Sequence, residues 1–187
     1  IRCRLAHNGA VPFEGHPNGW LPEHFFNKEQ CGGGSLIDLG AHPIYLTNRL
    51  AGPAEALTAR LQHTKGLEVD DNAVVLVEYQ SGALGTIETG FLSKQCPFLL
   101  ELYGTDGTLL IEDNKIRLKS GQLDKEGWHT PEELPVALPS AMEQWVAAIN
   151  DKKQPSITEK DVRNLTLINE AAVISNEENR RVQLDEI

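Results

Sequence analysis

The sequence lacks long apolar runs and has a deficit of positive charge. No unbroken apolar run exceeds five residues, as in Ala73–Val77, which is far too short to span a membrane. Lysine and arginine number 17 against 27 aspartates and glutamates, which gives a formal net charge of −10. Such a charge argues against nucleic acid or an anionic membrane as a partner.

Cysteine is also scarce. Cys3, Cys31 and Cys96 are odd in number and far apart, so they predict neither a disulfide framework nor a metal-binding knuckle. A cytoplasmic location follows as the expectation. The hydrophobic fraction of 40% and the length of 187 residues are ordinary for a globular domain with its own core.

Turn signals and hydrophobic periodicity predict six or seven mostly adjacent antiparallel strands and a short final one. The expected strands are 1–7, 55–64, 72–80, 83–92, 98–104, 108–113, 115–120 and 180–184. The expected helices are 34–50, 140–150 and 158–176, the last two beginning at capping boxes. Trp145, on the second helix, is expected in the core. Residues 8–30 are expected to be irregular, a length that is uncommon without a functional role.

This order of elements does not match a dinucleotide-binding fold. No G-x-G-x-x-G follows a strand, and there is no Walker-type loop. The pattern predicts an α+β domain, with one open, mainly antiparallel sheet and helices packed on one face.

Strand 72–80 is apolar on both faces. Val74 and Leu76 point one way, and Ala73, Val75 and Val77 point the other, whereas a sheet with one solvated face should alternate cleanly. The helices can cover one face only, so the other face should expose a mixed apolar patch. The sequence therefore predicts a homo-oligomer, most simply a two-fold dimer, through the open sheet face.

The stretch GGGSLIDLGAHPIYL, from Gly32 to Leu46, places an acid and an imidazole four residues apart. On a continuous helix Asp38 and His42 share a face, and Pro43 is expected to distort the helix just after His42. Three interpretations remain open from the residues alone. The pair is structural, it transfers a proton, or it contributes to a metal site that lacks further ligands at suitable spacing.

This stretch resembles the signature of the C-terminal domain of the glucose–fructose oxidoreductase / inositol dehydrogenase family. That signature is a glycine pair, then Asp, a hydrophobic residue, Gly, any residue and His. Further similarities are Trp20 upstream, the hairpin LELYGTDGTLLIED and the closing segment INEAAVISNEENRRVQL. The resemblance covers nearly the whole chain. It implies oxidation of a sugar or cyclitol hydroxyl, or reduction of the ketone, with NAD or NADP.

The resemblance also implies roles for residues. His42 would be the acid/base on the reacting hydroxyl, and Asp38 would hydrogen-bond the substrate or the histidine. Further substrate-binding candidates are His7, Trp20, Glu23, His24, Lys94 and Gln95. No metal is expected. Tyr45 stands where many relatives have an acid, so the substrate class stays open.

Residues 1–187 are thus expected to form the substrate-binding and oligomerisation domain of an NAD(P)-dependent oxidoreductase. The cofactor would bind mainly to an N-terminal Rossmann domain that this chain does not contain, together with a lysine from an E-K-P-like segment. The chain alone should fold but be inactive. The alternatives are a stand-alone ligand-binding module that has lost catalysis and a purely structural dimerisation domain.

Overall fold

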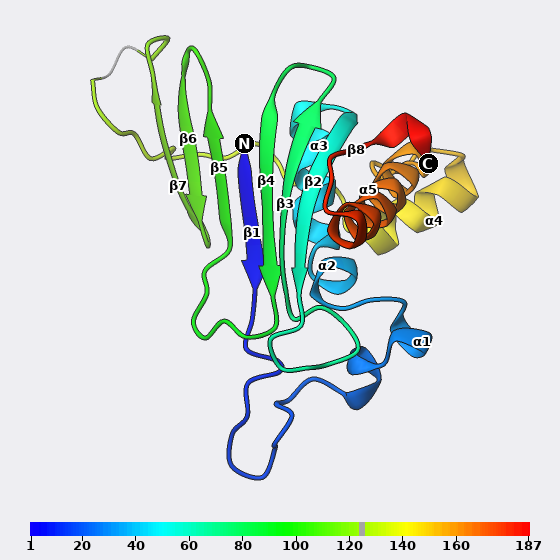
Figure 1. The fold of residues 1–187 in the computed structure, drawn as a ribbon. Coiled ribbons are helices and arrows are strands. Elements are labelled where there is room, and N and C mark those ends of the chain that lie inside the picture. Colours follow the sequence, from blue (N-terminus) through cyan, green and yellow to red (C-terminus); the bar gives the residue numbers. More distant parts are fainter. Residues whose placement is uncertain (124–125) are drawn as a thin grey trace.

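The computed structural model describes residues 1–123 and 126–187, which form one eight-stranded sheet and a set of helices (Figure 1). The strands are β1 (Arg2–Ala6), β2 (Ala54–Gln62), β3 (Asn72–Tyr79), β4 (Leu84–Gly90), β5 (Leu99–Tyr103), β6 (Gly107–Glu112), β7 (Lys115–Ser120) and β8 (Val182–Gln183). The α-helices are α1 (Lys28–Cys31), α2 (Ser35–Asp38), α3 (Ala41–Ala51), α4 (Ala141–Asp151) and α5 (Glu159–Glu178). Two short 3₁₀ helices are η1 (Glu23–Phe26) and η2 (Leu184–Glu186).

The sheet has the order β7-β6-β5-β1-β4-β3-β2-β8. Every pairing is antiparallel except that of β1 with β4, in which Arg2 lies opposite Thr86 and Ala6 opposite Gly90. The N-terminal strand therefore lies in the middle of the sheet and joins the two groups of hairpin-connected strands. The predicted α+β class, with an open and mainly antiparallel sheet, is confirmed.

The main core lies between β2–β4 and the helices α3 and α5 (Figure 1). Val75 and Val77 are fully buried beneath these helices, whereas Val74 and Leu76 on the other face are 49% and 47% exposed. The predicted uncovered apolar face of β3 is therefore present. Ser175 of α5 ties the helix to the sheet, because its Oγ accepts from the Ala59 amide at 2.9 Å.

The expected helix 34–50 is in fact two helices, and the prediction of a distortion after His42 was wrong. The break lies earlier, at Leu39 and Gly40, where the Gly40 amide donates to the Ser35 carbonyl at 3.0 Å. A Cβ on Gly40 would lie 2.1 Å from the Leu36 carbonyl oxygen, so only glycine fits this junction. Pro43 is the third residue of α3, where an amide needs no partner within the helix.

The prediction that Trp145 lies in the core was also wrong. Helix α4 begins at the predicted capping box of Ser140 and Glu143, but none of its residues is buried. Trp145 is 61% exposed. The reason is that α3 and α5 already occupy the helix-covered face over β2–β4, so α4 lies outside them (Figure 1).

Candidate functional site

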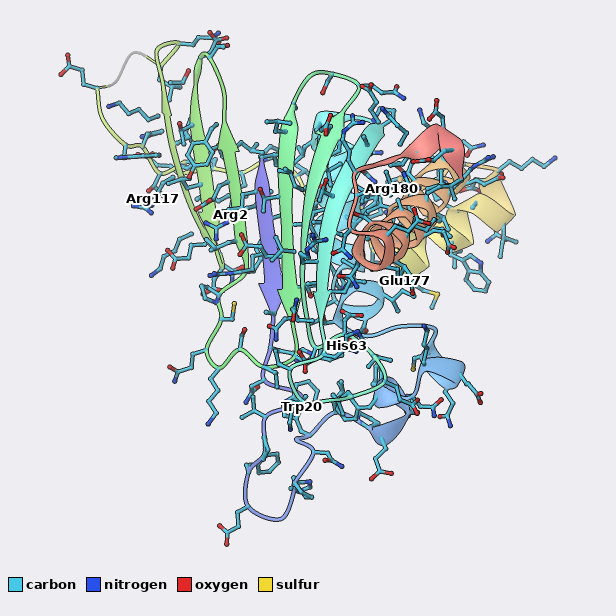
Figure 2. The ribbon with its side chains drawn as sticks, in the orientation of Figure 1. Arg2, Trp20, His63, Arg117, Glu177 and Arg180 are labelled. Atoms are coloured by element: carbon cyan, nitrogen blue, oxygen red, sulfur yellow. The ribbon has the colours of Figure 1, made fainter. Side chains whose placement is uncertain are left out.

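Three aromatic rings meet at the end of the sheet where β1 and β4 finish. His7 follows β1, and its ring stacks on Phe91 at a centroid distance of 5.3 Å. Trp20 lies against the same imidazole at 4.7 Å, tilted by 52°. Trp20 is 49% exposed and lies beyond the strand ends in Figure 2. His7 and Trp20, two of the predicted substrate-binding residues, are thus brought together beside solvent.

Backbone hydrogen bonds hold His7 in place, and the Gly9 amide fixes the tautomer of its ring. The His7 amide donates to the Gly90 carbonyl and its own carbonyl accepts from the Ser93 amide, both at 3.0 Å. The Gly9 amide donates to Nδ1 at 3.0 Å, so a neutral ring carries its proton on Nε2. Burial lowers the pKa of His7 below its usual value, and a backbone hydrogen bond and, more weakly, the carboxylate of Asp38 partly offset this. The site therefore combines a neutral imidazole donor with a nearby carboxylate.

Asp38 and His42 lie on different helices. Asp38 ends α2 and is half-buried, whereas His42 is the second residue of α3 and is exposed. Within residues 1–123 and 126–187, no hydrogen bond joins their side chains. The electrostatic influence of Asp38 acts instead on His7. The four-residue spacing that made the pair conspicuous is interrupted by the Gly40 junction.

His42 borders a cavity of about 220 Å³ between α3 and the start of α5. The cavity is lined by Ala41, His42, Tyr45, Ile157, Asp161, Val162 and Leu165. His42 therefore has mainly apolar neighbours on this side, while its own side chain is exposed to solvent.

A buried carboxylate that the sequence reasoning missed holds the motif in place. Asp70 is 5% exposed and accepts from the Gly34 amide at 3.0 Å, the Ser35 hydroxyl at 2.7 Å and the Leu36 amide at 2.9 Å. A Cβ on Gly34 would lie 2.0 Å from the Asp70 carbonyl oxygen, so this approach requires glycine. Asp70 thereby caps α2 and fixes the helix that carries Asp38. The sequence feature that could have revealed this carboxylate is the adjacent acid pair Asp70 and Asp71, which comes directly before an apolar strand.

Of the remaining predicted substrate-binding residues, two lie close to His7 in the chain fold and two lie on η1. Lys94 and Gln95 are exposed in the loop that follows β4, directly after the Ser93 amide that bonds His7. Glu23 and His24 are exposed on η1. The described contacts of His24 are with Phe25, Asn27 and Cys31, and none of them links η1 to Asp38 or His42.

The described part of the chain does not fit a dinucleotide. The Gly32–Gly34 run follows helix α1 rather than a strand, and the amides at the start of α2 are already bonded to the Asp70 carboxylate, which would repel a phosphate. No cluster of three or more His, Cys, Asp or Glu side chains among the described residues has the arrangement of a metal site. None of the helices described has the length and hydrophobicity needed to cross a bilayer.

Comparisons with known proteins agree with this architecture. Residues 4–110 match the model of the family described as the GFO/IDH/MocA C-terminal domain. A curated relative, the 1,5-anhydro-D-fructose reductase of Ensifer adhaerens, is 24% identical over 168 residues, which cover 86% of this chain and 49% of the relative.

Two solved structures extend the likeness of fold to nearly the whole chain. Levoglucosan dehydrogenase in complex with NADH and levoglucosan superposes with a TM-score of 0.81 at 22% identity, covering 98% of this chain and 57% of that one. An NAD-binding oxidoreductase from Klebsiella pneumoniae gives a TM-score of 0.77 at 21% identity, covering 98% of this chain and 58% of that one. The chain thus spans about half the length of the proteins it resembles.

Proposed function

Because the chain belongs to the GFO/IDH/MocA C-terminal domain family, we propose that it is the substrate domain of an NAD(P)-dependent oxidoreductase. The substrate is a sugar, cyclitol or related polyol, acted on at a hydroxyl or the corresponding ketone. The observation that carries this proposal is the grouping of His7, Trp20 and the Asp38 carboxylate at one end of the sheet, next to the helix of His42. The sugar-active relatives support the same class.

The chemistry of these groups suits a polyhydroxylated ligand. The indole face of Trp20 offers an apolar surface to the C–H groups of a sugar ring, while its edge is held by Asn8, whose Oδ1 accepts from Nε1 at 3.3 Å. His7 donates a hydrogen bond from Nε2, and Asp38 accepts from a hydroxyl. His42 holds or releases the proton of the reacting hydroxyl.

The cofactor is NAD or NADP, held by a dinucleotide-binding domain outside residues 1–187. When bound, it supplies or accepts the hydride. The poor fit of a pyrophosphate at α2 and the NADH present in the levoglucosan dehydrogenase structure both support this division of labour. The chain alone is accordingly inactive, and calorimetric titration with NADH or NADPH should detect no micromolar binding.

The acid/base role of His42 is tested in the protein that joins this domain to its dinucleotide-binding partner. His42→Ala should lower turnover by roughly 10²–10⁴-fold, the usual contribution of a positioned acid or base. Asp38→Asn should also lower turnover and shift the pH profile. His129→Ala, next to β7, is the matched control and should leave both unchanged. Wild-type rates and profiles in both site variants would mean that the pair is only structural.

We also infer that a second copy of the chain covers the open sheet face, and that the protein resides in the cytoplasm. The exposed Val74 and Leu76 support the first inference. The three cysteines are all free, which supports the second.

A further inference from the structure

Helix α4 presents its apolar side to solvent. Met142, Trp145, Val146 and Ile149 recur at the spacing of a single helix face, and they are 65%, 61%, 45% and 61% exposed. These four residues are called the α4 stripe below. An amphipathic helix normally turns such a stripe toward its own core, so its exposure indicates that a partner covers it.

The side of α4 opposite the stripe contacts the rest of the domain, and its half-buried residues are Gln144, Ala147 and Ala148. Gln144 lies roughly opposite the stripe, and its Nε2 donates to the Pro139 carbonyl while its Oε1 accepts from the Ser156 amide, both at 2.7 Å. The Ser156 carbonyl in turn accepts from Arg49 of α3 at 3.3 Å. The helix is therefore anchored through the side opposite the stripe, and the stripe points away from the domain.

An isolated helix of 11 residues is marginal in water, because most helical stability in proteins comes from packing of the apolar face. Within residues 1–123 and 126–187, α4 has no buried residue and no extensive packing against another helix or strand. The capping box of Ser140 and Glu143 supports its first turn but cannot replace packing. A stable α4 thus requires a surface seated on the stripe.

We propose that the α4 stripe is the docking surface for the dinucleotide-binding domain. This inference rests on the proposed function. The chain spans 57% of the levoglucosan dehydrogenase chain, so a substantial part of such a protein remains to occupy the surface. The open sheet face is a separate surface, away from the helices, and is the one assigned to a second copy (Figure 1).

The position of His42 explains why docking at α4 serves the reaction. Ser156 links α4 to α3, the helix that carries His42. The adjoining Ile157 and Val162, 51% and 56% exposed, line the cavity beside His42. A domain seated on the stripe is therefore held in a fixed position relative to His42. Such a fixed position is needed because the hydride and the proton must be transferred at the same carbon–oxygen group.

Hydrogen exchange tests which partner covers the stripe. In residues 1–187 alone, the amides of α4 should exchange fast at every protein concentration. In the protein that includes the dinucleotide-binding domain they should exchange at least about tenfold more slowly. Protection of α4 that appears in the 187-residue chain and grows with its concentration would identify a second copy as the occupant and overturn the proposal. Equally fast exchange in the longer protein would overturn it as well.

A matched pair of substitutions in the longer protein tests the role in catalysis. Ile149→Asp places a charge within the stripe, whereas Asn150→Asp adds the same charge to the same helix turn outside it. Ile149→Asp should lower kcat/KM for the sugar by roughly 10²-fold, because small misplacements of reacting groups are costly, with the dinucleotide Kd within about twofold of wild type. Asn150→Asp should match wild type.

Equal behaviour of the two variants would overturn the docking surface while the proposed function stands. A longer protein that binds neither NADH nor NADPH would overturn the proposed function, and the docking with it.

Discussion

The two halves of the sheet have similar apolar content but different burial. In β2–β4, Val75, Val77 and Ile87 are completely buried under α3 and α5. In β5–β7, where Figure 1 shows no helix on the strands, Leu100 is the one buried residue among those described. Helices, not strand composition, make the difference. The covered half therefore has its own core beneath α3 and α5, while β5–β7 and α4 leave nearly all of their apolar side chains at least partly exposed.

Replacing the buried carboxylate of Asp70, which precedes β3 in the covered half, is expected to lower the free energy of unfolding the most. Asp70→Ala leaves the Gly34 and Leu36 amides and the Ser35 hydroxyl without their acceptor in a dry environment. We expect the free energy of unfolding to fall by about 3–5 kcal/mol, since each unsatisfied buried donor costs about 1–3 kcal/mol. Urea titration followed by circular dichroism measures it.

Asp106→Ala, in the exposed hairpin turn between β5 and β6, is the control from the uncovered half and should change the free energy of unfolding by less than about 0.5 kcal/mol. Asp70→Asn keeps two of the acceptor contacts and should cost less than Asp70→Ala. Similar costs for Asp70→Ala and Asp106→Ala would show that Asp70 does not hold the motif.

Two neighbouring valines of β3 should differ in their contribution to the free energy of unfolding, and this is the next largest effect expected. Val75→Ala removes two methyl groups from a fully buried site and should lower the free energy of unfolding by about 2–3 kcal/mol. Val74→Ala, on the half-exposed face, should cost less than about 0.5 kcal/mol in the monomer. Equal losses measured by urea titration at low protein concentration would mean that both faces are covered within one chain.

The sequence predicted the strands well because their signals are local. Turn pairs such as Ser81-Gly82 and the apolar run within residues 72–80 depend on neighbours in the chain. The same is true of the capping boxes that begin α4 and α5. The family signature added the grouping of His7 and Trp20, which no periodicity could provide.

The features that the sequence did not reveal depend on distant contacts. The break at Gly40 follows from the close approach of the Leu36 carbonyl, and the role of Asp70 depends on a residue 36 positions earlier in the chain. Trp145 has the spacing of a core residue, and its helix does have an apolar face. Periodicity shows that a face will be buried but not whether the partner lies in the same chain.

A substitution on the uncovered sheet face should change the free energy of unfolding less, but it should clearly change the oligomeric state. Leu76 lies opposite Thr86 and is 47% exposed, so Leu76→Arg should leave the fold intact while placing a charge in the expected contact between copies. Sedimentation equilibrium at micromolar concentration should show wild-type dimers and Leu76→Arg monomers. Val173→Arg, on the exposed side of α5, is the control and should remain dimeric. A monomeric wild type would show that this face is covered in another way.

The smallest expected effect concerns the protonation of His7. Burial lowers its pKa in the folded chain below the usual value of 6.5, so as the pH falls the unfolded chain takes up this proton first. Stability should therefore decline from pH 7.5 to 5.5 by a component that His7→Phe removes while keeping a ring against Phe91. The pKa is also lowered for four acids, Glu78, Glu143, Asp161 and Glu186. They lose their contributions to stability only at more acidic pH, because their usual pKa values are already 4.5 or less.

Asp38→Asn removes the charge that favours the imidazolium form of His7 and should steepen the decline in stability. Urea titrations at the two pH values, with NMR titration of the His7 ring, measure both changes. Identical slopes in wild type, His7→Phe and Asp38→Asn would show that Asp38 and His7 are not electrostatically coupled.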